Sequence, residues 1–128
     1  ERFGYLYRKK DPRRLRAVLL ESIRQEGKLD FSGDAYALER LVRGLSPSPG
    51  TFTEYRGQRM KVRKAEVVES GIHSAAGQIL SADENGIAVA CGMNTLLITE
   101  LQMPGKKPAK AADYLRGNSV EKGEILGS

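Results

Sequence analysis

A five-residue segment near the middle of the chain constrains the fold more than any other feature. The segment Ser46-Pro47-Ser48-Pro49-Gly50 holds two prolines, each of which lacks a backbone donor and fixes its φ angle. Its glycine permits a turn. The segment therefore cannot be helical, and we interpret it as a rigid connector. Apolar residues follow a helical period before it and mainly an alternating period after it, so it separates two kinds of structure.

Two helices are predicted before the connector. The first has an apolar face of Leu15, Val18, Leu19 and Ile23, with Asp11 as N-cap, Pro12 just inside the start and Gly27 as the stop. The second has an apolar face of Leu38, Leu41, Val42 and Leu45, with Ser32 or Asp34 as the cap and Gly44 and Pro47 at its end. Both stripes have the spacing of one helix face packed against a core.

Short strands are predicted between Thr51 and about Met103. They begin near Phe52, after a tight turn at residues 56–59, at Gly77, at Ile87 and at Leu96, and Glu84-Asn85-Gly86 is a turn signal. The phase of apolar residues slips between Val62 and Ala65, which predicts a β-bulge. We interpret residues 96–101 as a strand buried on both faces and residues 69–74 as a loop. A short helix over residues 109–116 follows, ended by Gly117. Five or so strands with close turns favour a small closed or half-open barrel.

The residue inventory offers no catalytic apparatus. The single histidine, His73, falls in the predicted loop, and the single cysteine, Cys91, falls among alanines in a strand, where we expect a small buried thiol. One cysteine forms no internal disulfide and no cysteine metal cage. The acids Asp30, Asp34, Glu39 and Asp113 are scattered single residues that we interpret as caps and solvated positions. We therefore predict no catalytic residue and no metal site.

Basic residues are clustered, and the chain carries a formal net charge of +5. Five cations without an acid among them occupy residues 56–64, and alternation along a strand predicts that Arg59, Lys61 and Arg63 share one face. A phosphate backbone would relieve their mutual repulsion. The predicted nucleic-acid-binding residues are Arg43, Arg56, Arg59, Lys61, Arg63, Lys64, Lys106, Lys107 and Lys110. The second cluster is Lys106, Lys107 and Lys110, in a Pro/Gly-framed loop that leads into the last helix. The third, near the start, is Arg8, Lys9, Lys10, Arg13, Arg14 and Arg16.

Two interpretations of these clusters stay open at this point: ordinary solvated faces, or an RNA-binding surface. Three clusters on one net-basic domain favour the second. The chain has no tryptophan and few aromatic residues, so we expect backbone and shape contacts rather than base stacking. No apolar run reaches the length of a membrane span, and no signal peptide is recognisable in Glu1-Arg2-Phe3-Gly4-Tyr5. Because the chain opens without methionine, we expect it to be a fragment or processed piece.

Several ordered motifs resemble the C-terminal domain of methionyl-tRNA formyltransferases. They are the stretch from Leu41 to Thr53 (LVRGLSPSPGTFT), the stretch from Gly57 to Val68 (GQRMKVRKAEVV), and Glu100 to Pro108 (ELQMPGKKP) followed by Ala112 to Gly117 (ADYLRG). The segment Gly27-Lys28-Leu29-Asp30-Phe31-Ser32 resembles the piece that precedes them. The resemblance covers roughly residues 27 to 127.

This resemblance implies an architecture and a role. Enzymes of the family transfer a formyl group from 10-formyltetrahydrofolate to methionine carried on initiator tRNA in the cytoplasm. Their folate site and catalytic residues belong to an N-terminal domain, and their C-terminal domain is an OB-like barrel whose basic face helps to hold tRNA. The expectation is thus a mainly β fold with flanking helices: residues 1–50 form a helical and linker segment, residues 51–128 the barrel, and both one compact domain. No cofactor is expected here, and the expected partners are tRNA and the N-terminal catalytic domain, with no membrane.

The chain departs from the family pattern at two places. Ser48 stands where an aromatic residue is common, and the stretch from Asp11 to Glu26 is longer and more helical than the family linker. Two alternatives therefore stay open. Beside the tRNA-binding domain that the resemblance implies, the chain could be the equivalent domain of a sugar-nucleotide N-formyltransferase, or a docking domain that does not bind RNA. A stand-alone enzyme is disfavoured by the missing catalytic residues.

Overall fold

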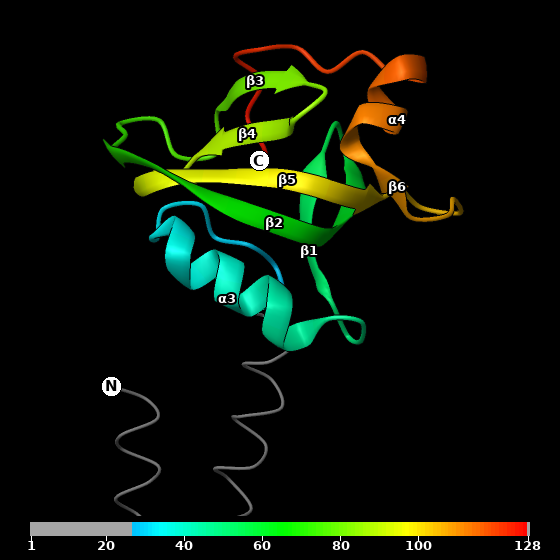
Figure 1. The fold of residues 1–128 in the computed structure, drawn as a ribbon, viewed down its shortest axis with the longest axis horizontal. Helices are drawn as coiled ribbons and strands as arrows, with labels where there is room; N and C mark the ends of the chain where they lie inside the picture. The colour runs from blue at the N-terminus through cyan, green and yellow to red at the C-terminus, as the bar shows by residue number, and fades with distance from the viewer. Residues whose placement is uncertain (1–26, 128) are drawn as a thin grey trace, which may run out of the picture.

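A computed structural model describes residues 27–127 and confirms the mainly β class with a helix before the strands and a short helix after them (Figure 1). The predicted helix at Leu15–Ile23 and the basic cluster at residues 8–16 lie outside the described residues. The elements, in chain order, are α3 (Ala35–Leu45), β1 (Thr51–Tyr55), β2 (Gln58–Ile72), β3 (Ile79–Asp83), β4 (Gly86–Ala90), β5 (Met93–Gln102), β6 (Ala109–Lys110) and α4 (Ala111–Gly117).

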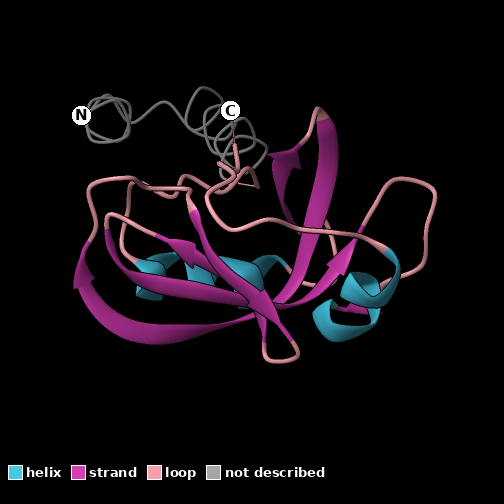
Figure 2. Cartoon of the chain, turned by 90° about the horizontal axis from the view of Figure 1, so that it is seen from above, coloured by secondary structure: helices cyan, strands magenta, loops and turns pink. Residues whose placement is uncertain are grey.

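The strands form one antiparallel sheet in the order β1-β2-β5-β4-β3, and β6 pairs with β5. The long strand β2 and its neighbour β5 bend across the molecule, so the sheet curls toward a barrel (Figure 2). The gap between β3 and β1 is spanned by residues 123–127, here called the strap. Leu126 donates its N–H to the carbonyl of Gly77, and Gly127 donates to the carbonyl of Glu54. The strap therefore closes the barrel by hydrogen bonds to both edge regions.

The helix α3 forms where its apolar stripe predicts it. Its inward residues Ala35, Leu38 and Val42 are buried, and the Asp34 carboxylate caps the helix by accepting a hydrogen bond from the Tyr36 N–H at 3.0 Å. The helix ends before the connector, where Gly50 takes a φ of 79° and donates to the Leu45 carbonyl. The two Ser–Pro peptide bonds of the connector are cis. The sequence-based prediction of this helix and its end is confirmed.

The predicted bulge lies in β2. The register pairs Val62 with Leu101 and Lys64 with Glu100, which leaves Arg63 without a partner on β5. A second irregularity follows at once, because Lys64 pairs with Glu100 while Ala65 pairs with Ile98. Each strand thus carries one extra residue, and the apolar phase shifts in both. Such paired irregularities bend long strands around a core.

Two sequence-based predictions are wrong in detail. β2 continues to Ile72, so residues 69–72 are strand rather than loop, because Val68 and Ile72 still pair with β5. The strand over residues 96–101 is not buried on both faces. Leu96, Ile98 and Leu101 are buried, whereas residues 97, 99 and 100 are only partly buried. The register shift explains why Ile98 and Leu101, three positions apart, are both buried.

The hydrophobic core lies inside the curled sheet, between α3 and the strap. Its largest fully buried side chains include Met60, Ile87, Leu96 and Ile98. Leu29 and Phe31, from the segment before α3, are 3% and 4% exposed and belong to the same core. Residues 27–50 and the strands therefore pack as one unit within the described part of the chain.

Candidate nucleic-acid interface

The hairpin of β1 and β2 presents two of the predicted cations on its outer face. Alternation along β2 buries Met60 and Val62 and exposes Arg59 and Lys61. Lys61 pairs in register with Phe52 on one side and Gln102 on the other. A row of outward side chains therefore crosses three strands, and its central member is a lysine.

Hollows flank these two cations. One, of about 390 Å³, is lined by Gly27, Pro49, Gly50, Thr51 and Phe52 together with Arg59 and Lys61. Another, of about 280 Å³, is lined by Gln102, Met103, Pro104 and Gly105 together with the same two cations. Arg59 and Lys61 thus form a ridge between the connector and the loop after β5. Both hollows are open and partly apolar, so the surface on either side of the two cations is concave rather than flat.

Arg59 is held over an aromatic ring. Its guanidinium carbon lies 3.9 Å from the centre of the Phe52 ring, the geometry of a cation–π contact. The Arg59 side chain is exposed and makes no hydrogen bond or ion pair with any described residue. Phe52 was not among the predicted site residues. Its place in an alternating strand gave no sign that a basic side chain from the next strand would cover it.

The second predicted cluster lies beside the ridge. Gln102 donates a hydrogen bond from Nε2 to the Lys106 carbonyl at 2.9 Å, which ties the loop after β5 to the row on the sheet. Lys106 and Lys107 are exposed and line a third hollow, of about 440 Å³, with Tyr114 of α4. This hollow shares Met103 and Pro104 with the one beside Arg59. Gln102, which sequence reasoning missed, is therefore the link between the two basic clusters.

Two of the remaining predicted cations, Lys64 and Lys110, lie on either side of an acid. Lys64 and Lys110 are both register partners of Glu100, one on each side. Arg63 lies at the bulge and is only partly exposed, so strict alternation with Arg59 and Lys61 does not hold there. The structure brings Arg59, Lys61, Lys106 and Lys107 around adjoining hollows and leaves the Lys64–Lys110 pair beside Glu100.

Arg56 has a different environment from its neighbours. It sits in the two-residue turn of the hairpin with a φ of 50°, followed by Gly57 at 78°. Its Nε and Nη2 donate to the Glu124 carboxylate at 2.8 and 3.1 Å, and the Tyr55 hydroxyl donates to the same carboxylate at 2.8 Å. Arg56, the Glu121 N–H and Tyr55 together lower the pKa of Glu124 to about 2. This contact ties the hairpin to the strap.

Arg43 is also engaged within the fold. Its Nε donates to the Glu39 carboxylate at 2.6 Å, one turn earlier on α3. Such an exposed i, i+4 pair contributes a few tenths of a kcal/mol to the helix, about 0.3–0.5 kcal/mol. Two of the nine predicted cations, Arg43 and Arg56, are thus ion-paired with glutamates.

The histidine and the cysteine occupy positions that carry no evident chemistry. His73 is partly buried rather than freely exposed, because its Nε2 lies 2.8 Å from the Ser70 hydroxyl and 3.3 Å from that of Thr95. No acid among the described residues hydrogen-bonds to its ring. Cys91 is fully buried, and burial raises the pKa of its thiol to about 11. A neutral, inaccessible thiol is unreactive. The described residues contain no group of three or more potential metal ligands.

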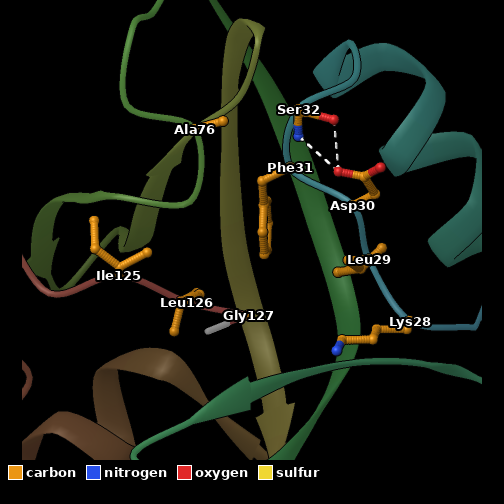
Figure 3. A pocket seen from close by; sticks show the side chains of 9 residues that line it. All are labelled: Lys28, Leu29, Asp30, Phe31, Ser32, Ala76, Ile125, Leu126 and Gly127. Atoms are coloured by element: carbon orange, nitrogen blue, oxygen red, sulfur yellow. Dashed lines mark hydrogen bonds between the residues drawn. The ribbon is translucent and has the colours of Figure 1, made fainter.

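A larger hollow of about 480 Å³ lies between the segment before α3 and the strap (Figure 3). Buried Leu29, Phe31 and Leu126 make its apolar floor. Its one acid, Asp30, accepts hydrogen bonds from the backbone and hydroxyl of Ser32 at 3.0 and 2.6 Å, which lower the Asp30 pKa. The hydrogen bonds of this carboxylate therefore stabilise the turn before α3.

Within residues 27–127 no helix is long and apolar enough to cross a membrane.

Comparison with known proteins identifies the family of the chain. The family described as "Formyl transferase, C-terminal domain" matches residues 22–119. The chain belongs to this family. Curated relatives named methionyl-tRNA formyltransferase include those of Alkaliphilus oremlandii, 46% identical over 79% of the chain, and Clostridium botulinum, 41% identical over 77%. One from Neisseria meningitidis is 41% identical over 80%. The chain spans about a third of the length of these relatives, 32–33%.

Solved structures share the fold. HypX from Aquifex aeolicus, in complex with tetrahydrofolic acid, superposes with a TM-score of 0.56 at 14% identity and covers 77% of the chain, which corresponds to 20% of that protein. A substituted variant of the same protein gives a TM-score of 0.56 at 16% identity, covering 74% of the chain and 18% of that protein. At these identities the likeness concerns the fold alone.

Proposed function

We propose that the chain is the tRNA-binding C-terminal domain of a methionyl-tRNA formyltransferase, a cytoplasmic enzyme of translation initiation. The observation that carries this is the ridge of Arg59 and Lys61 between two hollows, continued by Lys106 and Lys107. No described residue forms a salt bridge with any of these four cations. Unpaired cations gathered around a concave surface are the electrostatic footprint of a polyanion site.

The chemistry of the whole enzyme belongs to the part that its relatives carry outside this domain. In the proposed reaction, the amino nitrogen of methionine forms a bond to the formyl carbon of 10-formyltetrahydrofolate. The bond from that carbon to N10 of the folate breaks, and the proton lost by the methionyl nitrogen is balanced by one that N10 gains, which gives formylmethionyl-tRNA and tetrahydrofolate. The domain described here supplies no group to this step. Its part is to hold the tRNA body so that the acceptor end reaches the catalytic domain, which lowers the entropic barrier.

Phosphate contacts should dominate this binding. Each phosphate neutralised by lysine or arginine releases condensed counterions, so affinity falls as salt rises. Contacts to phosphate carry little sequence information. The domain would therefore bind many tRNAs similarly, and the choice of initiator tRNA would rest with the rest of the enzyme.

The test is a salt titration of the chain with fluorescently labelled tRNA. We expect log K to fall linearly with log salt. Arg59→Ala combined with Lys61→Ala should weaken binding and make the slope shallower by about 1.4 to 1.8, since each phosphate contact contributes about 0.7–0.9. Arg40→Ala with Lys122→Ala removes the same charge at exposed positions outside the hollows and is the matched control. A flat salt response, or equal loss in both double variants, would overturn the proposal.

A docking role is the second candidate, and one observation favours it. Ile72 and Met93 are register partners at the far end of β2, with 80% and 44% of their surface exposed. Contiguous exposed apolar surface is a feature of contact surfaces, and these two residues are adjacent on the sheet. If docking were the sole role, Ile72→Ser with Met93→Ser would abolish association with the separately produced remainder of the enzyme. The tRNA affinity of the chain would then not respond to loss of Arg59 and Lys61.

A further inference from the structure

The contact between Arg59 and Phe52 suggests more than charge. An arginine that lies on an aromatic ring uses one face of its planar guanidinium, and its opposite face stays available for stacking. The guanidinium carbon of Arg59 is 3.9 Å from the ring centre of Phe52, and its N–H groups have no partner among the described residues. In contrast, the guanidinium carbon of Arg56 lies 4.9 Å from the centre of the Tyr55 ring, and its Nε and Nη2 donate hydrogen bonds to the Glu124 carboxylate.

We infer that Arg59, backed by Phe52, is a stacking platform for one unpaired base of the bound RNA, and that Lys61 binds a phosphate beside it. This rests on the proposed RNA-binding function and deepens it. Proteins that bind single-stranded RNA stack bases on aromatic rings and on arginine planes. The chain is poor in exposed aromatic rings, but an arginine fixed on a phenylalanine gives an equivalent flat surface.

The surroundings of Arg59 fit a base better than a duplex backbone. The hollow on its β5 side is about 280 Å³, just below the range of roughly 300–1,000 Å³ for drug-sized ligands. Met103 and Pro104 give it an apolar wall that a phosphate would not favour. Gln102 lines the same hollow and donates one N–H to the Lys106 carbonyl, and within residues 27–127 no group donates to its amide oxygen, which can therefore accept from a base N–H.

Preorganisation supports the same assignment. A free arginine side chain loses rotamer freedom when it stacks on a ligand, and this loss weakens binding. Contact with the Phe52 ring restricts the orientation of the Arg59 guanidinium before RNA binds. A site that required charge alone would gain nothing from this order, since a lysine neutralises a phosphate as a point charge.

The decisive variant is Arg59→Lys, which keeps the charge and removes the plane. Lys61→Arg is the matched control, because it keeps the charge and leaves Arg59 in place. The probes are an unstructured uridine oligonucleotide with a central 2-aminopurine and an RNA duplex with the same number of phosphates. Phe52→Leu keeps an apolar side chain at position 52 and removes the ring below Arg59. Thermal unfolding of each variant establishes that it is folded.

We expect Arg59→Lys to weaken binding of the single strand about tenfold, within the range for loss of one stacked base. Duplex affinity should change by less than about twofold. The quenching of 2-aminopurine fluorescence on binding should fall with Arg59→Lys and with Phe52→Leu, but not with Lys61→Arg. If Arg59→Lys binds both probes like the unsubstituted chain, the stacking inference is wrong and the RNA-binding function stands. If Arg59→Ala with Lys61→Ala also binds both probes normally, the proposed function fails as well.

Discussion

Arg56 and Arg59 lie three residues apart on one hairpin, and both lie over an aromatic ring, yet they have opposite roles in the structure. Arg56 is held by Glu124 of the strap, 68 positions later in the chain. Arg59 meets no acid among the described residues and stands between two hollows. Basic residues that are neighbours in the sequence therefore do not have equivalent environments on the surface. A distant partner decides which of them stabilise the fold and which remain free for a ligand.

On one side of the hairpin, the strap packs closely against the start of β3 and closes the barrel. Gly77 has a φ of 92°, and a Cβ there would lie 2.9 Å from the Leu126 carbonyl, so the strap approaches the start of β3 as closely as backbone permits. Leu126 itself is buried, at 4% exposure. The ridge side carries no such packing. We therefore expect substitutions on the strap side to change stability and substitutions on the ridge to change RNA affinity.

The largest effect should come from Leu126→Ala. Removing a buried leucine side chain costs about 2–5 kcal/mol, through lost burial and the cavity left behind. Urea unfolding should show this loss, while RNA affinity at a temperature where the variant is folded should stay within about twofold. Lys122→Ala, on an exposed residue near the strap, is the control and should leave stability within about 0.5 kcal/mol. Unchanged stability in Leu126→Ala would mean that the strap does not close the barrel.

Next in size is the contrast between the two arginines. Arg59→Ala should weaken RNA binding roughly tenfold, because loss of one stacked base costs about 1–3 kcal/mol. It should leave the urea midpoint nearly unchanged. Arg56→Ala should lower the urea midpoint and leave RNA affinity within about twofold. Equal losses of RNA affinity in the two variants would erase the distinction between them.

A smaller loss of stability is expected for Tyr55→Phe. The ring stays in the core and only the hydroxyl donor to Glu124 is removed, so the free energy of unfolding should fall by about 0.5–1.5 kcal/mol. Urea denaturation measures it. In the background of Glu124→Gln the same substitution should have a smaller effect. If the two effects simply add, the hydroxyl and the carboxylate are not coupled.

The smallest effect is a change in pH dependence. The pKa of Glu124 is lowered from 4.5 to about 2 in the folded chain, so its contribution to stability is fully present above pH 4.5 and is lost as the pH falls through about 2. Glu124→Gln should therefore flatten the dependence of the melting temperature on pH between about 4.5 and 2. Circular dichroism melts across that range measure this. An unaltered profile in Glu124→Gln would show that Arg56 does not hold the carboxylate.

Much of the local structure followed from local patterns. The stripe of Leu38 and Val42 predicted α3, the phase slip after Val62 predicted the bulge, and Glu84-Asn85-Gly86 predicted the turn between β3 and β4. Each depends on residues close together in the sequence, where period and turn chemistry act. The extension of β2 to Ile72 was missed because Ser70 and Gly71 suggested a break, whereas pairing with β5 carries the strand through them.

The candidate interface also contains some residues that local sequence patterns predicted and others that they missed. Cation clusters were visible in the sequence, because composition alone reveals them. Phe52 and Gln102 were missed, since one pairs across a hairpin and the other acts through the Lys106 backbone. Neither contact leaves a pattern of period two or 3.6. Which residues contact RNA stays a prediction until binding is measured.

The class of fold, the connector and the basic, histidine-poor character could be predicted from the sequence, because periodicity, proline chemistry and charge are properties of short segments. The ion pair between Arg56 and Glu124 and the contact of Arg59 with the Phe52 ring became visible only in the folded chain. The physical reason is range. Ion pairs and ring contacts act over a few ångströms in space, and chain folding brings together residues dozens of positions apart to make them.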